Sequence, residues 1–385
     1  MKKTNYIEIE NKYLAKTYGR TPVTFTIGKG DILVDDNGKN YIDFGSGIAV
    51  NGLGYGNKKW VKATTKQIKT LAHASNLYYT KPMVMLAEKL CQKANMERVF
   101  FGNSGAEANE CAIKAARKYA SDKGKGTKII TLVNSFHGRT MATLTATGQD
   151  GLHKYFDPFL DGFDYAIAGD FDDLVSKCTE DVCAVMFELV QGEGGVIALD
   201  KEYVKKVVDF AKEKDILVVV DEVQTGNGRT GTYFAYQQYD IEPDIVTTAK
   251  GLGNGLPIGA CLFGKKTADI LTPGTHGSTF GGNPVACAGA CVVLDQIDDK
   301  LLEDVKVKAT ILTDALKKCR KVKSVSGLGL MIGIEVDNAP SIKQECLEKG
   351  LVVLTAHDKI RLLPPLNITY GDLDAGIKIL TEVLG

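Results

Sequence analysis

Residues 216–250 read ILVVVDEVQTGNGRTGTYFAYQQYDIEPDIVTTAK, and this stretch decides the fold. It opens with five apolar residues, 216–220, a run so short and uniform that it indicates a strand covered on both faces, as in a parallel α/β sheet. Asp221 and Glu222 stand directly at the C-terminal end of this strand. A second β-like run, 244–248, leads to Lys250 and a glycine-rich segment.

Two consecutive strand ends therefore deliver an acid and an amine to one part of the molecule. In open α/β sheets, ligands bind beyond the C-terminal ends of the strands. A solvated side chain is the ordinary interpretation of either charge alone. Together they suggest pyridoxal 5'-phosphate, with a Schiff base on Lys250 and with Asp221 holding the pyridine nitrogen protonated.

The composition excludes several classes of protein. The 385 residues carry 47 basic and 47 acidic side chains, which removes the electrostatic argument for a nucleic-acid or membrane partner. Nine cysteines occur without a C-x-x-C pair, so we expect reduced thiols in a cytoplasmic protein and no metal site. The N-terminal residues lack the apolar core of a signal peptide, and no apolar run is long enough to span a membrane.

Alternating strand and helix patterns from about residue 98 to residue 264 predict a large domain with a mostly parallel, doubly wound sheet. The region 151–180 is expected to be irregular apart from a short strand at 165–167. A hairpin-like patch precedes the large domain, and a strand–helix tail follows it; together they would form a smaller α+β domain. The expected boundaries are 1–60 for the N-terminal part of the small domain, 61–298 for the large domain and 299–385 for the C-terminal part.

The segment GNSGAEANE, residues 102–110, predicts a turn of small residues that opens a helix. Free backbone N–H groups and the positive end of the helix dipole suit a phosphate group. An ordinary N-cap is the alternative, because Ser104 with Glu107 three residues later forms a capping pattern. The spacing leaves both interpretations open, and it does not match a P-loop.

AKGLGNGLPIGA at 249–260, with DEVQTGNGRTG at 221–231 upstream, resembles the class III, ornithine-type aminotransferases. The resemblance covers essentially the whole chain. It implies an α/β fold of the pyridoxal-phosphate-dependent transferase fold type I, like aspartate aminotransferase, and a homodimer with shared active sites. It further implies transamination of N2-acetyl-L-ornithine with 2-oxoglutarate, giving N-acetyl-L-glutamate 5-semialdehyde and L-glutamate, in arginine biosynthesis.

The same resemblance implies roles for individual residues. Lys250 and Asp221 would be catalytic. In the family, Ser104, Gly105 and the next residue hold the phosphate, and that next residue is more often threonine than the Ala106 of this chain. The expected cofactor-binding set is Ser104, Gly105, Ala106, Phe136, Asp221, Glu222, Val223, Gln224, Lys250 and Thr279, where Phe136 and Val223 face the ring, Gln224 contacts its phenolic oxygen and Thr279 reaches the phosphate in the neighbouring subunit.

The substrate-binding residues implied by the resemblance are Arg139, Glu193, Ser278 and Arg361. Arginine is suited to two-pronged recognition of carboxylates. Arg361 would bind the α-carboxylate of 2-oxoglutarate and Arg139 the distal one. Glu193 would neutralise Arg361 when the amine donor is bound, and Ser278 would lie beside the substrate.

Other functions remain as alternatives. Succinylornithine, N-succinyl-diaminopimelate, ornithine and 4-aminobutyrate transaminases share the chemistry. The segment GIAV at 47–50 has no tyrosine to hold a free α-amino group, which favours an acylated donor. A racemase or aminomutase could use the same lysine and aspartate. A dinucleotide-dependent oxidoreductase is disfavoured, because the glycines after Lys250 do not meet the G-x-G-x-x-G spacing.

Overall fold

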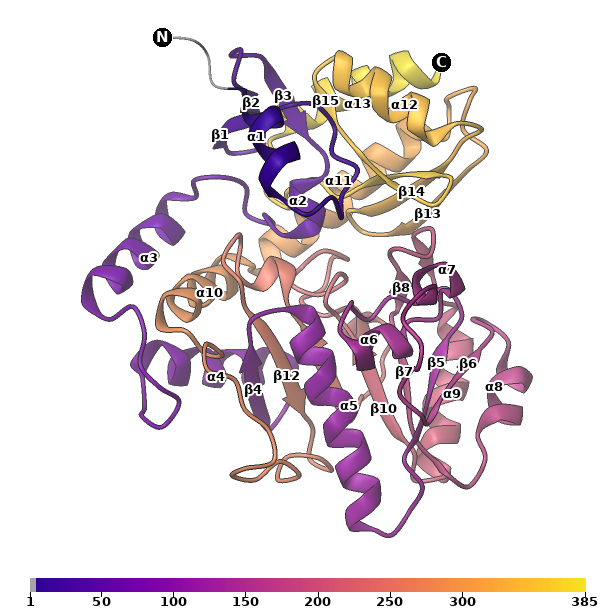
Figure 1. Ribbon diagram of the computed structural model, residues 1–385. Helices are drawn as coiled ribbons and strands as arrows, with labels where there is room; N and C mark the ends of the chain where they lie inside the picture. Colours follow the sequence, from indigo (N-terminus) through magenta and orange to yellow (C-terminus); the bar gives the residue numbers. More distant parts are fainter. Residues whose placement is uncertain (1–4) are drawn as a thin grey trace.

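In the computed structural model, which describes residues 5–385, a seven-stranded sheet forms the centre of the larger part of the molecule (Figure 1). Its strands, in spatial order, are β4 Arg98–Gly102, β12 Gly259–Phe263, β11 Ile245–Thr248, β10 Leu217–Asp221, β7 Val182–Phe187, β5 Lys128–Leu132 and β6 Phe163–Ala166. Strand β12 runs antiparallel to both of its neighbours, whereas β10 is parallel to β11 and β7. The predicted mostly parallel, doubly wound sheet is therefore confirmed.

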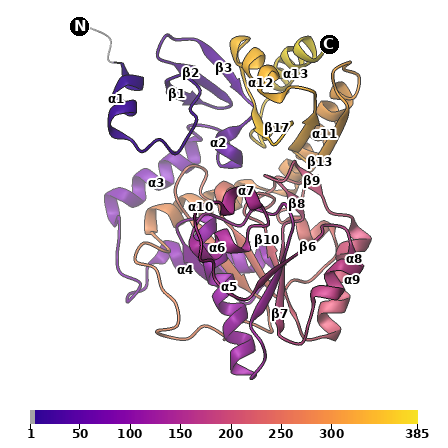
Figure 2. The ribbon, with the colours of Figure 1, turned by 45° about the vertical axis from the view of Figure 1, so that its right-hand side comes forward.

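Helices cover both faces of this sheet (Figures 1 and 2). Those of the larger part are α3 Lys58–Thr70, α4 Lys81–Ala94, α5 Gly105–Asp122, α6 Met141–Ala146, α7 Asp150–His153, α8 Phe171–Lys177, α9 Lys201–Glu213 and α10 Pro284–Gln296, with the 3₁₀ turns η1 Ala235–Gln238 and η2 Lys250–Leu252. A small β8–β9 pair, Val190–Gln191 with Ile197–Ala198, lies near the C-terminal strand ends. Throughout residues 5–385, no helix is both long and apolar enough to cross a membrane.

The central strand β10 is buried on both faces, and its side chains alternate between two layers. Leu217 and Val219 pack with Cys111 and Ala112 of α5, in one apolar cluster. Val218 and Val220 belong to the cluster that contains the apolar face of α9. Full burial of such side chains stabilises the fold by about 1.5–3 kcal/mol each. Because side chains alternate along a strand, Asp221 continues the α5 face, and Glu222 falls on the opposite side.

The smaller part of the molecule brings the two ends of the chain together (Figure 1). Strand β3 pairs in parallel with β15, with Ile42 opposite Leu351. The elements here are α1 Tyr6–Tyr13, β1 Phe25–Lys29, β2 Ile32–Asp35, β3 Asn40–Asp43, α2 Ser46–Ala49, α11 Asp299–Leu316, β13 Ser324–Leu328, β14 Met331–Glu335, α12 Ala339–Glu348, β15 Leu351–Val352, β16 Leu354–Ala356, β17 Lys359–Leu362 and α13 Tyr370–Leu384. The expected α+β character from both chain ends is confirmed.

The region 151–180 is more regular than the sequence analysis expected. It contains helix α8, which begins after Asp170, whose side chain accepts a hydrogen bond from the Asp173 backbone N–H at 3.0 Å. Acidic residues in the first turn also stabilise a helix through its dipole. Leu174 anchors the helix in the core. The acidic residues therefore mark a helix start rather than an irregular loop.

Candidate active site

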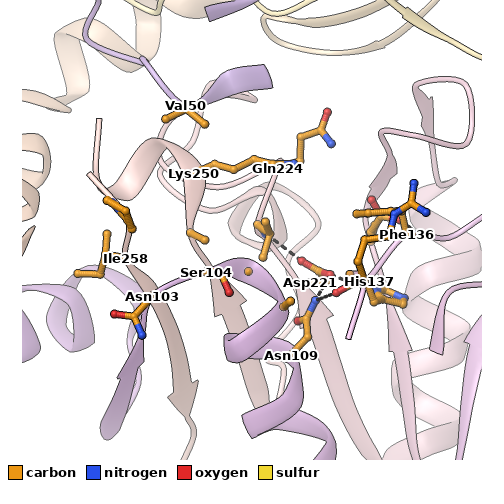
Figure 3. Close-up of a pocket in the computed structure, with 18 of the residues that line it drawn as sticks. Val50, Asn103, Ser104, Asn109, Phe136, His137, Asp221, Gln224, Lys250 and Ile258 are labelled. Carbon is orange, nitrogen blue, oxygen red and sulfur yellow. Dashed lines mark hydrogen bonds and ion pairs between the residues drawn. The ribbon is translucent and has the colours of Figure 1, made fainter. Parts of the chain in front are cut away.

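A cavity of about 440 Å³ lies at the C-terminal ends of strands β10 and β11 (Figure 3). One wall is the start of helix α5, and another is the segment that follows strand β5. Asp221 and Lys250 both line it, so the two strand ends deliver their acid and their amine to one cavity. The described residues hold no group of His, Cys, Asp and Glu side chains suited to a metal ion.

Asp221 lies at the cavity with its carboxylate held from three directions (Figure 3). Its Oδ2 accepts a hydrogen bond from Asn109 Nδ2 at 2.7 Å and one from His137 Nδ1 at 2.8 Å. Its Oδ1 accepts one from the Val223 backbone N–H at 3.0 Å. A carboxylate offers about four acceptor positions, so this one can still accept the N–H of a protonated ring.

Lys250 opens η2, two residues beyond the end of strand β11. Its φ of 42° lies in the left-handed region, a conformation that costs on the order of 1–3 kcal/mol and is typical of functional sites. Burial lowers the pKa of Lys250; Glu193 opposes this shift, and Arg361 reinforces it. A lowered pKa leaves more of the lysine as the neutral amine, which is the nucleophilic form.

The start of helix α5 forms the part of the cavity that fits a phosphate. No acceptor among the described residues lies within hydrogen-bond distance of the backbone N–H groups of Gly105 and Ala106. A Cβ atom on Gly105 would lie 2.7 Å from Val223 Cγ1, so only glycine allows this close approach. The Ser104 hydroxyl is already bonded to Glu107, at 2.9 Å to Oε2 and 3.2 Å from the backbone N. The two free amides at a helix start are donors suited to a phosphate group.

Phe136 and Arg139 line the cavity on the side of strand β5. The Phe136 backbone N–H donates to Glu188 Oε2 at 2.9 Å, which fixes the loop that carries its ring. The guanidinium of Arg139 lies 5.7 Å from the centre of that ring and is solvent-exposed, so it is free to bind a carboxylate. Val223 lines the cavity beside Gly105.

Glu193 and Arg361 form an ion pair next to the cavity. Arg361 Nη1 donates to Glu193 Oε1 at 2.6 Å and lies 3.4 Å from Oε1 of Gln224, which itself lines the cavity. Arg361 is buried, while the Glu193 side chain is 30% exposed. In the described part of the chain, the buried Nε of Arg361 has no partner. The guanidinium thus keeps donor capacity for a carboxylate other than Glu193.

Ser278 and Thr279 lie outside this cavity. Ser278 Oγ accepts hydrogen bonds from Asn103 Nδ2 at 3.2 Å and from the Gly281 backbone N–H at 3.0 Å. Asn103 lines the cavity, so Ser278 adjoins it through one side chain. Thr279 is exposed and lines a separate surface pocket with Leu77. Within one chain the structure does not bring Thr279 to the cavity that Lys250 and Asp221 line.

Glu222 does not line the cavity, and its expected contact with the cofactor does not fit the structure. Its Oε2 accepts from the Thr225 hydroxyl at 2.6 Å and its Oε1 from the Tyr236 backbone N–H at 2.8 Å. The physical reason is strand alternation, which turns Glu222 to the side opposite Asp221. Burial raises the pKa of Glu222 to about 7.

Among the cavity-lining residues that the sequence analysis did not assign are Asn109, His137 and Glu188. Glu188 follows the apolar strand β7 directly, as Asp221 follows β10, so the same strand-end argument could have found it. Burial raises the pKa of Glu188 to about 7. His137 lies next to Phe136 in a loop, where sequence alone assigns it no partner. The feature that could have indicated Asn109 is a polar amide among the buried alanines of helix α5.

The chain is similar to known proteins over nearly its whole length. The profile of the family described as "Aminotransferase class-III" matches residues 13–384. The chain is 49% identical over 383 residues to an acetylornithine aminotransferase of Haemophilus ducreyi, covering 98% of each chain. It is 45% identical over 392 residues to the protein of that name from Methanocaldococcus jannaschii, covering 100% of this chain and 98% of the other.

Solved structures show the same overall arrangement. An N-acetylornithine aminotransferase from Stenotrophomonas maltophilia superposes with a TM-score of 0.84 at 36% identity, and the match covers 98% of each chain. An ornithine aminotransferase from Toxoplasma gondii superposes with a TM-score of 0.94 at 30% identity, covering 98% of this chain and 94% of the other.

Proposed function

The chain belongs to the class-III aminotransferases, and on this premise we propose that it transfers the terminal amino group of N2-acetyl-L-ornithine to 2-oxoglutarate. The products are N-acetyl-L-glutamate 5-semialdehyde and L-glutamate, and the reaction is a step of arginine biosynthesis. The observation that carries the proposal is the placement of Lys250 and Asp221 at one cavity. Relatives named acetylornithine aminotransferase, at 43–49% identity over nearly the whole chain, support the donor.

The enzyme uses pyridoxal phosphate, which supplies an aldehyde that reacts with amines and a ring that accepts electrons. The residues present fit this group. The free amides of Gly105 and Ala106 would bind its phosphate, and Phe136 and Val223 would face its ring. Asp221 would accept the ring N–H, because its carboxylate keeps one acceptor position. Gln224 would contact the phenolic oxygen.

Lys250 would first bind the cofactor and would then act as base and acid. Its lowered pKa favours the neutral amine. Once the donor amine has taken its place, the Lys250 amine can remove a proton from the substrate carbon that bears nitrogen. It then returns a proton at the next step, as a positioned general acid–base group does.

Glu193 and Arg361 would allow one site to accept two different substrates. With the donor bound, Glu193 stays on Arg361 and neutralises it. With 2-oxoglutarate, the pair would open, and Arg361 would bind the α-carboxylate through its free donors. The exposed Arg139 would hold the distal carboxylate, and Ser278 would lie beside the substrate.

The chain would act as a homodimer, with Thr279 of each subunit near the phosphate site of the other. Thr279 lines a surface pocket beside Leu77, and the neighbouring tyrosines, Tyr78 and Tyr79, together with Phe280, are exposed. Large exposed apolar side chains that gather in this way are typical of protein interfaces. Light scattering of the eluting protein measures the mass directly, and a monomer would contradict this part of the proposal.

We place the enzyme in the cytoplasm. All nine cysteines are free, and most of them are buried. Free thiols persist in the reducing environment of the cytoplasm, whereas oxidising compartments favour disulfides.

The decisive experiment is an absorption spectrum of the purified protein with its cofactor. N-acetylornithine should bleach the yellow band, and 2-oxoglutarate should restore it. Ornithine and 4-aminobutyrate serve as matched donors, and each should bleach the band more slowly. If N-acetylornithine left the band unchanged, the proposed donor would be wrong. If 2-oxoglutarate did not restore a bleached band, the proposed acceptor would be wrong.

A further inference from the structure

We propose that Asn109 is a positioning residue that fixes the carboxylate of Asp221 for the ring nitrogen of the cofactor. This inference rests on the role proposed above for Asp221. Asn109 lies in the second turn of helix α5, is 1% exposed and lines the cavity together with Asp221. Figure 3 shows its amide beside the Asp221 carboxylate, and His137 also lies next to that carboxylate.

Three of the four hydrogen-bonding positions of the Asn109 amide are occupied, including both of its donors. Nδ2 donates to Asp221 Oδ2 and to the His137 backbone carbonyl, both at 2.7 Å. Oδ1 accepts from the Thr247 hydroxyl at 2.6 Å. A flipped amide would place Oδ1 against two acceptor oxygens and Nδ2 against the hydroxyl. The surroundings therefore allow one orientation, the one that donates to Asp221.

The amide also determines which acceptor positions of Asp221 stay free. Asn109 and His137 both donate to Oδ2, and the Val223 N–H donates to Oδ1. Of the roughly four acceptor positions of a carboxylate, the fourth remains for a ligand. Because three donors from three segments hold the carboxylate, it cannot rotate without breaking buried hydrogen bonds.

Helix α5 joins this function to phosphate binding. Gly105, with its free amide, and Asn109 are four residues apart on the same rigid helix. Four residues correspond to about one turn and a rise of roughly 6 Å. One helix thus provides the phosphate donors and the group that orients the partner of the ring nitrogen. The two ends of the cofactor are positioned by one element rather than by independent loops.

The test compares two cofactors in apoenzyme titrations of the wild type and Asn109→Ala. One is pyridoxal phosphate, and the other is its carbocyclic analogue, in which a C–H group replaces the ring nitrogen. Loss of a hydrogen bond to a charged group should weaken the binding of pyridoxal phosphate by roughly 10- to 100-fold. Affinity for the analogue should change less than about threefold, because the analogue makes no ring N–H contact.

Thr247→Val is the matched second variant, because valine has nearly the same shape and only the donor to Asn109 Oδ1 is removed. It should weaken pyridoxal phosphate binding by a smaller factor and again spare the analogue. Equal losses for both cofactors in the variants, or no loss for either, would overturn the positioning role. Failure of the wild type to transaminate while Asn109→Ala still discriminates between the cofactors would instead overturn the proposed function alone. Thermal unfolding of each apoenzyme checks folding, and Thr247→Val decides the question if Asn109→Ala does not fold.

Discussion

The two sides of the β10 strand end hold two carboxylates that are adjacent in sequence and almost equally buried. Asp221 is 3% exposed and Glu222 is 0% exposed. Asp221 borders a cavity and receives donors from Asn109, His137 and Val223. Glu222 is enclosed by the chain segment that follows it, where Thr225 and Tyr236 are its donors. The comparison teaches that burial alone does not identify a candidate catalytic carboxylate; the cavity beside Asp221 does.

The two sides also differ in how far their partners lie along the chain. The side-chain donors to Asp221 come from α5 and from the loop after β5, both distant in sequence. Both donors to Glu222 come from the next fourteen residues. The α5 side is therefore assembled by the tertiary fold, and the Glu222 side by a local turn. We call them the open side and the closed side.

The largest expected effect comes from exchanging each acid for its amide. Asp221→Asn should lower kcat/KM by about 10³-fold, because a preorganised electrostatic partner of the reacting group is worth 10²–10³ or more. Glu222→Gln should lower it less than about tenfold, since Glu222 does not reach the cavity. Steady-state kinetics with N-acetylornithine measure both. Similar losses in the two variants would erase the distinction between the sides.

On the closed side, Glu222 should make the free energy of unfolding depend on pH. The pKa of Glu222 is raised to about 7 from an ordinary value near 4.5, so its contribution is complete below pH 4.5 and is lost as pH rises through 7. This carboxyl should lower the apoenzyme's free energy of unfolding by about 3 kcal/mol across that window. Urea titrations at pH 5 and pH 8 should show a smaller difference for Glu222→Gln than for the wild type.

Glu188, which lines the cavity, provides the control for this prediction. Burial also raises the pKa of Glu188 to about 7, so Glu222→Gln should keep part of the slope. A variant with the full wild-type slope would show that Glu222 is ionised without penalty in the folded protein.

The Glu193–Arg361 ion pair next to the cavity should open in one half-reaction and stay closed in the other, and Glu193→Gln tests this. The substitution removes the negative charge of Glu193 that neutralises Arg361 but keeps an acceptor oxygen. The half-reaction with N-acetylornithine should slow by about tenfold, because the unneutralised Arg361 disfavours the donor, whereas that with 2-oxoglutarate should change much less. Stopped-flow absorbance separates the two. If both half-reactions changed by the same factor, the partner exchange would be refuted.

The smallest effect is expected for Thr225→Val. This change removes the hydroxyl that donates to Glu222 Oε2 at 2.6 Å. Loss of one such hydrogen bond should lower the free energy of unfolding by about 1–2 kcal/mol at pH 8, with kcat/KM unchanged. Urea titration and kinetics on the same preparation test both expectations. A loss of activity without a loss of stability would place Thr225 on the open side.

The strand-end argument predicted Asp221 and Lys250 because two apolar strands end in these polar residues, and parallel strand ends meet at one edge of a sheet. The family resemblance placed Glu222 in the cofactor-binding set, but strand alternation turns its side chain away from the cavity. Asn109 could not be predicted, since its role depends on the fold bringing α5 against Asp221 and Thr247. The role of Thr279 stays a prediction, because a single chain does not test it. The expected domain boundaries also stay predictions.

The sequence predicted the fold class more accurately than it predicted individual helices. Repeated apolar strands separated by helical patterns indicate a doubly wound sheet whatever the loops do. Helix α8 was missed because its start depends on a capping hydrogen bond that the Asp170 side chain accepts from the Asp173 backbone N–H. Composition alone does not distinguish such a helix start from a loop of acidic residues.

The parallel pairing of β3 with β15 has a consequence for the protein during its synthesis. Ile42 meets Leu351, a partner that leaves the ribosome about 310 residues later. At synthesis rates of roughly 5–20 residues per second, the edge of β3 waits for about 15–60 seconds without its neighbour. Unpaired strand edges template association with other chains. We therefore expect released chains truncated before residue 340 to expose this edge to chaperones and proteases, and released chains that extend past residue 352 to protect it.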